Sequence, residues 1–141
     1  MLTVIAVGLR AIFGLLVGLF LSVLGFYAGW FSSPPGPTLP ASILIIGAGL
    51  GAAAGGFIGW FKPEVPRSVF TFHLALALGG GLAGAWVGWE LGPVLYPEGL
   101  YRPGGTSSAP PFVVAIVAAS IGANSLTSGF YLLRLWRYRE V

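Results

Sequence analysis

Four apolar runs separated by proline-rich breaks constrain this sequence more than any other feature. A helix needs roughly 20 apolar residues to cross the hydrocarbon core of a bilayer, and each run reaches that length. Of the 141 residues, 56% are hydrophobic and 8% are charged, whereas a soluble domain carries about 25% charged residues. In water the chain could not cover its own surface with polar groups. The sequence therefore predicts an all-α integral membrane protein built as a four-helix bundle.

The proline-rich breaks set the predicted boundaries, because proline lacks the backbone N–H that a helix interior needs. The predicted spans cover residues 11–31, 41–61, 68–91 and 112–133, with an apolar extension before Arg10. The predicted outer connections are 32–40 and 92–111, and the predicted cytoplasmic connection is 62–67. We expect one membrane domain over residues 1–141.

Basic residues predict the orientation of this bundle. Six of the seven fall on one side of a four-span chain: Arg10, Lys62, Arg67, Arg134, Arg137 and Arg139. Because positive charge concentrates on the cytoplasmic side, we expect both termini there, in a multi-pass protein of a prokaryotic plasma (inner) membrane. Topology also accounts for the net charge of +3, so we expect no nucleic-acid partner.

Two rows of glycines recur at four-residue spacing, which places each row on one face of a helix. The rows are Gly47, Gly51, Gly55, Gly59 and Gly80, Gly84, Gly88, Gly92. Such faces let helix backbones approach closely in membranes, so the pattern predicts glycine-zipper packing. We expect the two rows to face each other or a shared neighbour.

A motif repeats near the ends of three spans, in the pattern G-x-x-x-G-W, at residues 25–30, 55–60 and 84–89. One interpretation is a duplicated helical hairpin, which would give two similar hairpins. The alternative is convergence, since tryptophan is enriched at membrane interfaces.

The fourth span carries a polar stripe at four-residue spacing: Ser120, Asn124 and Ser128. Asn124 falls near mid-bilayer by its place in the span, and we expect its amide to face protein, where it can find partners. Interhelical hydrogen bonding is one interpretation of the stripe, and a polar pore lining is the alternative. Glu90 is expected at the interface, paired with Arg102 or with another subunit.

His73 is the single histidine, and it lies inside the third span. It could ligate a haem or chlorophyll-type macrocycle, or it could bond a neighbouring helix or lie near the headgroups beside Glu64. We expect no cofactor in this chain, with macrocycle binding at His73 as the alternative. With no cysteine, thiolate metal sites are excluded, and we expect no metal. Bound structural lipids are expected at the basic flanks.

The longest connection places Tyr96, Tyr101 and Arg102 among turn-forming prolines and glycines. Aromatic and arginine side chains on such a loop are typical of docking surfaces, so we expect these three residues to contact a partner. A plain connector is the alternative.

No catalytic motif or pair of intramembrane carboxylates stands in the sequence, so we expect no enzyme activity from this chain alone. The small-residue faces exceed what four helices need among themselves, which favours contact with other transmembrane chains. The sequence predicts a non-catalytic accessory subunit of a larger complex, of the respiratory or photosynthetic electron-transfer type. The alternatives are a small homo-oligomeric channel or transporter, and a pigment- or haem-binding subunit that uses His73.

Overall fold

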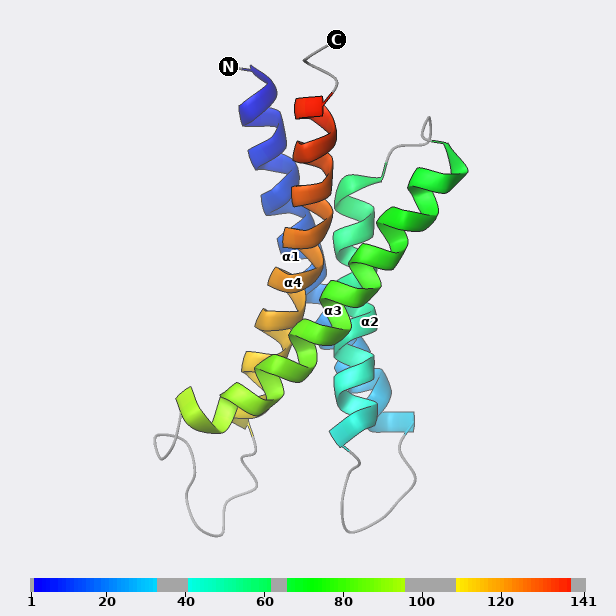
Figure 1. The fold of residues 1–141 in the computed structure, drawn as a ribbon. Helices are drawn as coiled ribbons and strands as arrows, with labels where there is room; N and C mark the ends of the chain where they lie inside the picture. The colour runs from blue at the N-terminus through cyan, green and yellow to red at the C-terminus, as the bar shows by residue number, and fades with distance from the viewer. Residues whose placement is uncertain (1, 33–40, 62–65, 96–108, 138–141) are drawn as a thin grey trace, which may run out of the picture.

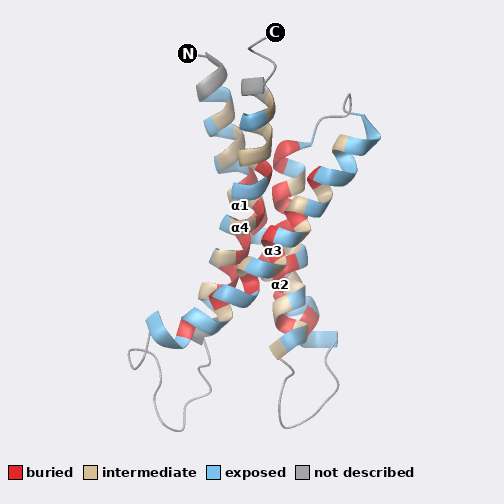
Figure 2. Cartoon of the chain, in the orientation of Figure 1, coloured by how far each residue is buried: buried red, intermediate tan, exposed pale blue. Residues whose placement is uncertain are grey.

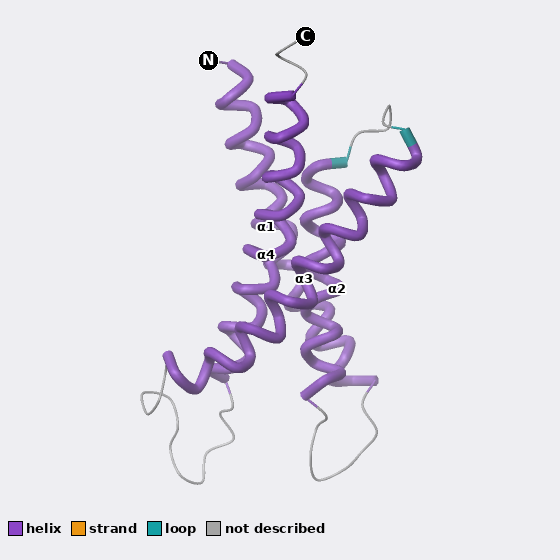
Figure 3. The backbone as a smooth tube through the Cα atoms, viewed as in Figure 1, coloured by secondary structure: helices purple, strands orange, loops and turns teal. Residues whose placement is uncertain are grey.

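The computed structural model describes residues 2–32, 41–61, 66–95 and 109–137, and these ranges contain no strand. They form four helices: α1 (Leu2–Ser32), α2 (Ala41–Trp60), α3 (Arg67–Leu95) and α4 (Ala109–Arg137). Each helix is long and apolar enough to cross a membrane. The tube in Figure 3 is accordingly helical over nearly all of the described backbone.

The helices alternate in direction, so α1 begins and α4 ends on one side of the bundle, where α2 ends and α3 begins (Figure 1). We call this the terminal side. The α1–α2 and α3–α4 pairs make the most extensive contacts, and α2 also packs on both α3 and α4. On the opposite side the two pairs diverge from each other (Figure 1).

The helix ends differ from three predicted boundaries. The helix α1 runs through Arg10, because nothing between residues 2 and 11 breaks a helix and arginine is a good helix former. The helix α3 continues past residue 91 through Pro93, since a proline in the last turn removes only one backbone hydrogen bond. The helix α4 begins at Ala109, with prolines in the first turn, where N–H groups have no helical partner.

Small side chains dominate the core. Most of the fully buried apolar residues are alanines, and the large ones among them are Phe26, Leu44, Trp60 and Ile116. Buried residues gather where the helices cross, and exposed residues cover the outer faces (Figure 2). In α1 only 17% of the most apolar window is buried, against 39% in α2. The chain on its own therefore leaves a wide apolar surface for the bilayer or for other proteins.

Candidate functional site

The glycine row of α2 lies against α1. A Cβ atom added at Gly59 would come 2.5 Å from the Cα of Gly14. Added at Gly47, Gly51 or Gly55, it would collide with the backbone of Gly25, Leu21 or Gly18, respectively. Real Cβ atoms essentially never come that close to another backbone, so this helix pair requires glycine at all four positions.

The glycine row of α3 lies against a different helix, α4. A Cβ atom at Gly80 would come 2.5 Å from the carbonyl oxygen of Gly122. At Gly88 it would come equally close to the carbonyl oxygen of Val114, and at Gly84 it would collide with that of Ala118. Gly92, the last of the row, is buried near the end of α3.

The expectation that the two rows face each other or share a neighbour is therefore wrong. The row of α2 packs on the preceding helix and the row of α3 on the following one, in the two pairs that make the most extensive contacts. The pairs meet instead at Gly49 of α2 and Gly81 of α3: a Cβ at Gly49 would come 3.1 Å from the Gly81 carbonyl oxygen. The close-contact surface of both rows is thus used inside the chain.

A further row of small residues on α3 is exposed. Ala75, Gly79 and Ala83 recur at four-residue spacing, and a Cβ atom at Gly79 would meet no heavy atom within 4 Å other than the backbone of its own helix. We call Ala75, Gly79 and Ala83 the outer α3 stripe. Phe72 and Trp86 lie seven residues before and after Gly79, on the same face of the helix, and are 50% and 63% exposed.

Asn124 joins three helices through its amide. Its Oδ1 accepts a hydrogen bond from the indole N–H of Trp60 on α2 at 3.0 Å, and its Nδ2 donates to the Ala11 carbonyl on α1 at 2.9 Å. Gly14 leaves room for the amide, since a Cβ there would come 2.8 Å from Oδ1. Through this bond Asn124 lies level with Trp60, the last residue of α2.

Trp60 itself differs from the interfacial tryptophans that the sequence predicts at helix ends. Its side chain is 1% exposed, and its ring centroid lies 5.0 Å from that of Tyr131 on α4. The ring and its N–H therefore fasten the end of α2 to α4 and do not anchor the chain in the headgroups.

The hydroxyls of the bundle are bonded in two ways. Ser22 of α1 donates across the helix pair to the Ala48 carbonyl at 2.9 Å. The hydroxyls of α4 bond carbonyls of their own helix: Ser120 to Ile116, Thr127 to Ala123, and Ser128 to Ser125. The stripe of α4 thus binds another helix only through Asn124.

Two buried nitrogens have no hydrogen-bond partner among the described residues: Nε2 of His73 and Nη1 of Arg10. The His73 ring lies between Phe57 of α2 and Phe130 of α4, at centroid distances of 6.2 and 6.1 Å. A metal approaching Nε2 would have to displace the protein atoms that cover it. Macrocycle ligation would therefore require these helices to open.

The remaining predicted site residues lie apart from these contacts. Glu90 is exposed on α3. Tyr96, Tyr101 and Arg102 lie outside the described residues, so the predicted docking loop stays a prediction. Among the described residues no three His, Cys, Asp or Glu side chains gather as metal ligands.

No protein-family model matches the chain, and comparisons with curated proteins and with solved structures gave no match either. Two features were not predicted from the sequence: the Gly49–Gly81 crossing and the outer α3 stripe. The four-residue spacing of the stripe is visible in the sequence. Small residues occupy so many positions of α3, however, that spacing alone cannot assign one face to a partner.

Proposed function

We propose that the protein is a non-catalytic accessory subunit of a larger membrane complex and that its outer α3 stripe receives a transmembrane helix of another subunit. The observation that carries this proposal is the uncovered row Ala75, Gly79 and Ala83. Positions that face lipid have no need of small side chains, whereas small residues at this spacing let a second backbone approach closely. Among the described residues, no other helix packs against Gly79.

For the host we propose an electron-transfer complex of the respiratory or photosynthetic kind, in a prokaryotic plasma membrane. This choice rests on analogy with a class of assemblies that contain small multi-span subunits. We place the terminal side in the cytoplasm, because Arg10, Arg67 and Arg134 lie toward that side of the described helices and positive charge favours it.

Purification through a C-terminal tag in mild detergent tests this proposal. We expect larger membrane proteins to be recovered in fixed stoichiometry with the tagged chain, as measured by mass spectrometry and densitometry. Recovery of the tagged chain alone, as a monodisperse oligomer, would contradict the proposal and favour the channel alternative.

The bonding of the α4 stripe supports a packing role over a channel. The hydroxyls of Ser120 and Thr127 are satisfied by their own helix, and the amide of Asn124 is held by two other helices. Solute flux into liposomes that contain only this chain, abolished by Asn124→Leu, would reverse that preference.

The pigment-binding alternative rests on the unpartnered Nε2 of His73. An absorbance spectrum of the purified complex tests it: a Soret or Qy band that disappears in His73→Leu would assign a macrocycle to this residue.

A further inference from the structure

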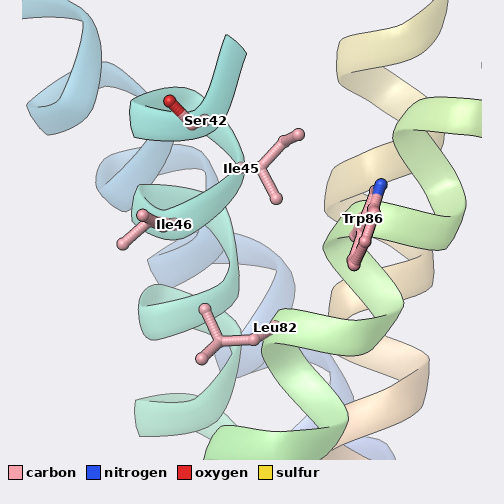
Figure 4. A pocket seen from close by; sticks show the side chains of 5 residues that line it. All are labelled: Ser42, Ile45, Ile46, Leu82 and Trp86. Carbon is pink, nitrogen blue, oxygen red and sulfur yellow. The ribbon is translucent and has the colours of Figure 1, made fainter. Parts of the chain in front are cut away.

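An apolar groove opens between α2 and α3 on the side of the bundle opposite the termini (Figure 4). It has a volume of about 390 Å³ and is lined by Ser42, Ile45 and Ile46 of α2 and by Leu82 and Trp86 of α3. Its closed end is the crossing where Gly49 meets Gly81 and Leu82. From that crossing the two helices diverge, so the groove widens toward the start of α2.

The groove must be filled when the protein is in a membrane. An empty space beside Ile45 and Leu82 would deprive these side chains of dispersion contacts on one side. Water is a poor occupant, because a bound water needs two to four polar partners and Ser42 supplies the one hydroxyl of the lining. The occupant is therefore apolar over most of its length.

The size and the lining of the groove suit an acyl chain. At roughly 30 Å³ for a water-sized group, the volume of about 390 Å³ holds about a dozen methylene groups. The lining is almost wholly apolar, as an acyl chain requires, and the groove narrows toward the crossing of Gly49 and Gly81.

The polar atoms of the lining lie where the headgroup of such a lipid would be. Ser42 is the second residue of α2, and Trp86 lies one turn beyond Leu82 toward the end of α3. In Figure 4 the Ser42 hydroxyl and the Trp86 indole nitrogen both lie toward the end of the groove that is remote from Leu82. Apolar atoms at depth and polar atoms at the mouth match a phospholipid standing in one leaflet, and tryptophan commonly anchors at that level.

We infer that this groove binds one acyl chain of a phospholipid from the leaflet opposite the termini, and that the lipid wedges the α1–α2 and α3–α4 pairs apart on that side. The lipid covers the Ile45 and Leu82 side chains and contacts Trp86. This inference stands on the groove alone and does not depend on the proposed subunit function.

Retention of lipid by variants of the full chain tests this inference. The protein is purified in dodecyl maltoside, incubated with palmitoyl-oleoyl phosphatidylglycerol, washed and analysed by native mass spectrometry. Ile45→Trp fills the groove, and the matched control Ile58→Trp adds the same bulk to an exposed position of the same helix. We expect wild type and Ile58→Trp to retain one lipid per chain and Ile45→Trp to show at least a tenfold lower lipid-bound fraction.

A wild-type chain that retains no lipid, or equal retention by Ile45→Trp, would overturn the inference. Helicity by circular dichroism and a monodisperse elution profile show whether each variant is folded. A second measurement does not depend on Ile45→Trp: a benzoylphenylalanine photocrosslinker at Ile46 should add the mass of a phospholipid in native membranes. A crosslink to a polypeptide at that position would instead assign the groove to a partner helix and contradict the inference.

Discussion

The two faces of α3 carry the same kinds of residue and have opposite surroundings. On the inner face, Gly80, Gly84 and Gly88 lie so close to the α4 backbone that a Cβ atom has no room. On the outer face, Gly79 has no neighbouring heavy atom within 4 Å of such a Cβ. A row of small residues therefore indicates close helix contact without saying whether the contact lies inside the chain or with another protein. Here the inner row holds the fold, and the outer row is the one that a partner can use.

The largest expected effect comes from placing leucine on the inner and on the outer face of α3. Gly84→Leu should separate α3 from α4, because its side chain would have to enter the space of the Ala118 backbone. Overpacking a core costs about 1–3 kcal/mol, and here the obstacle is backbone, so we expect a loss of at least ~3 kcal/mol in the free energy of unfolding. A denaturing-detergent titration followed by circular dichroism measures that loss.

Gly79→Leu is the matched control, on the same helix and five residues away. Its side chain enters open space, so we expect a free energy of unfolding within about 0.5 kcal/mol of wild type, as for ordinary surface substitutions. Equal destabilisation by the two leucines would mean that the inner and outer faces are wrongly assigned.

A smaller effect is expected from alanine substitutions on the two sides of one contact between α1 and α2. Gly55→Ala places its Cβ against the backbone of Gly18, whereas Gly18→Ala meets nothing nearer than 3.6 Å. We expect Gly55→Ala to cost about 1–3 kcal/mol. Gly18→Ala should leave stability unchanged or raise it by up to ~1 kcal/mol, through the better helix propensity of alanine. Thermal unfolding of both variants in one detergent measures the difference, and the reverse order would refute this packing.

Substitution of Asn124 tests the polar contacts between helices inside the bundle. Asn124→Leu removes both interhelical hydrogen bonds and leaves the buried indole N–H of Trp60 unpaired, which costs about 1–3 kcal/mol. A denaturant titration followed by circular dichroism measures the loss. If Asn124→Leu unfolds at the same denaturant concentration as wild type, the two bonds contribute nothing to stability.

The smallest expected effect compares two buried serines. Ser22→Ala removes a hydrogen bond between α1 and α2, and such interhelical bonds are worth on average ~0.6 kcal/mol in membranes. Ser120→Ala removes a bond to its own helix, whose backbone ladder remains, so we expect almost no change. Repeated titrations of both variants against wild type measure these losses, and a larger loss for Ser120→Ala would contradict the distinction.

The sequence was sufficient to predict four apolar helices, because the length of an apolar run and the position of prolines are local properties. The continuation of α1 through Arg10 and of α3 through Pro93 was harder to predict, since a single charge or a proline near a terminus does not stop a helix that is otherwise well bonded.

Which helix each glycine row contacts could not be predicted, because spacing defines a face of a helix and leaves its neighbour open. The same limit hid the bond between Asn124 and Trp60 and the burial of the Trp60 ring, which depend on how α2 packs against α4. The outer α3 stripe differs from the inner glycine row in having no helix among the described residues packed on it, and this difference is not visible in the sequence.

Co-purification of Gly79→Leu with its partners tests whether the outer α3 stripe receives a helix of another subunit. The tagged variant and the tagged wild type are purified in parallel from the same membranes, and the partner-to-bait ratio is measured by mass spectrometry. We predict that Gly79→Leu keeps the helicity and elution volume of the isolated chain and loses at least nine-tenths of the partner recovered with wild type. An unchanged partner-to-bait ratio would show that the outer α3 stripe faces lipid and that the proposed subunit contact is wrong.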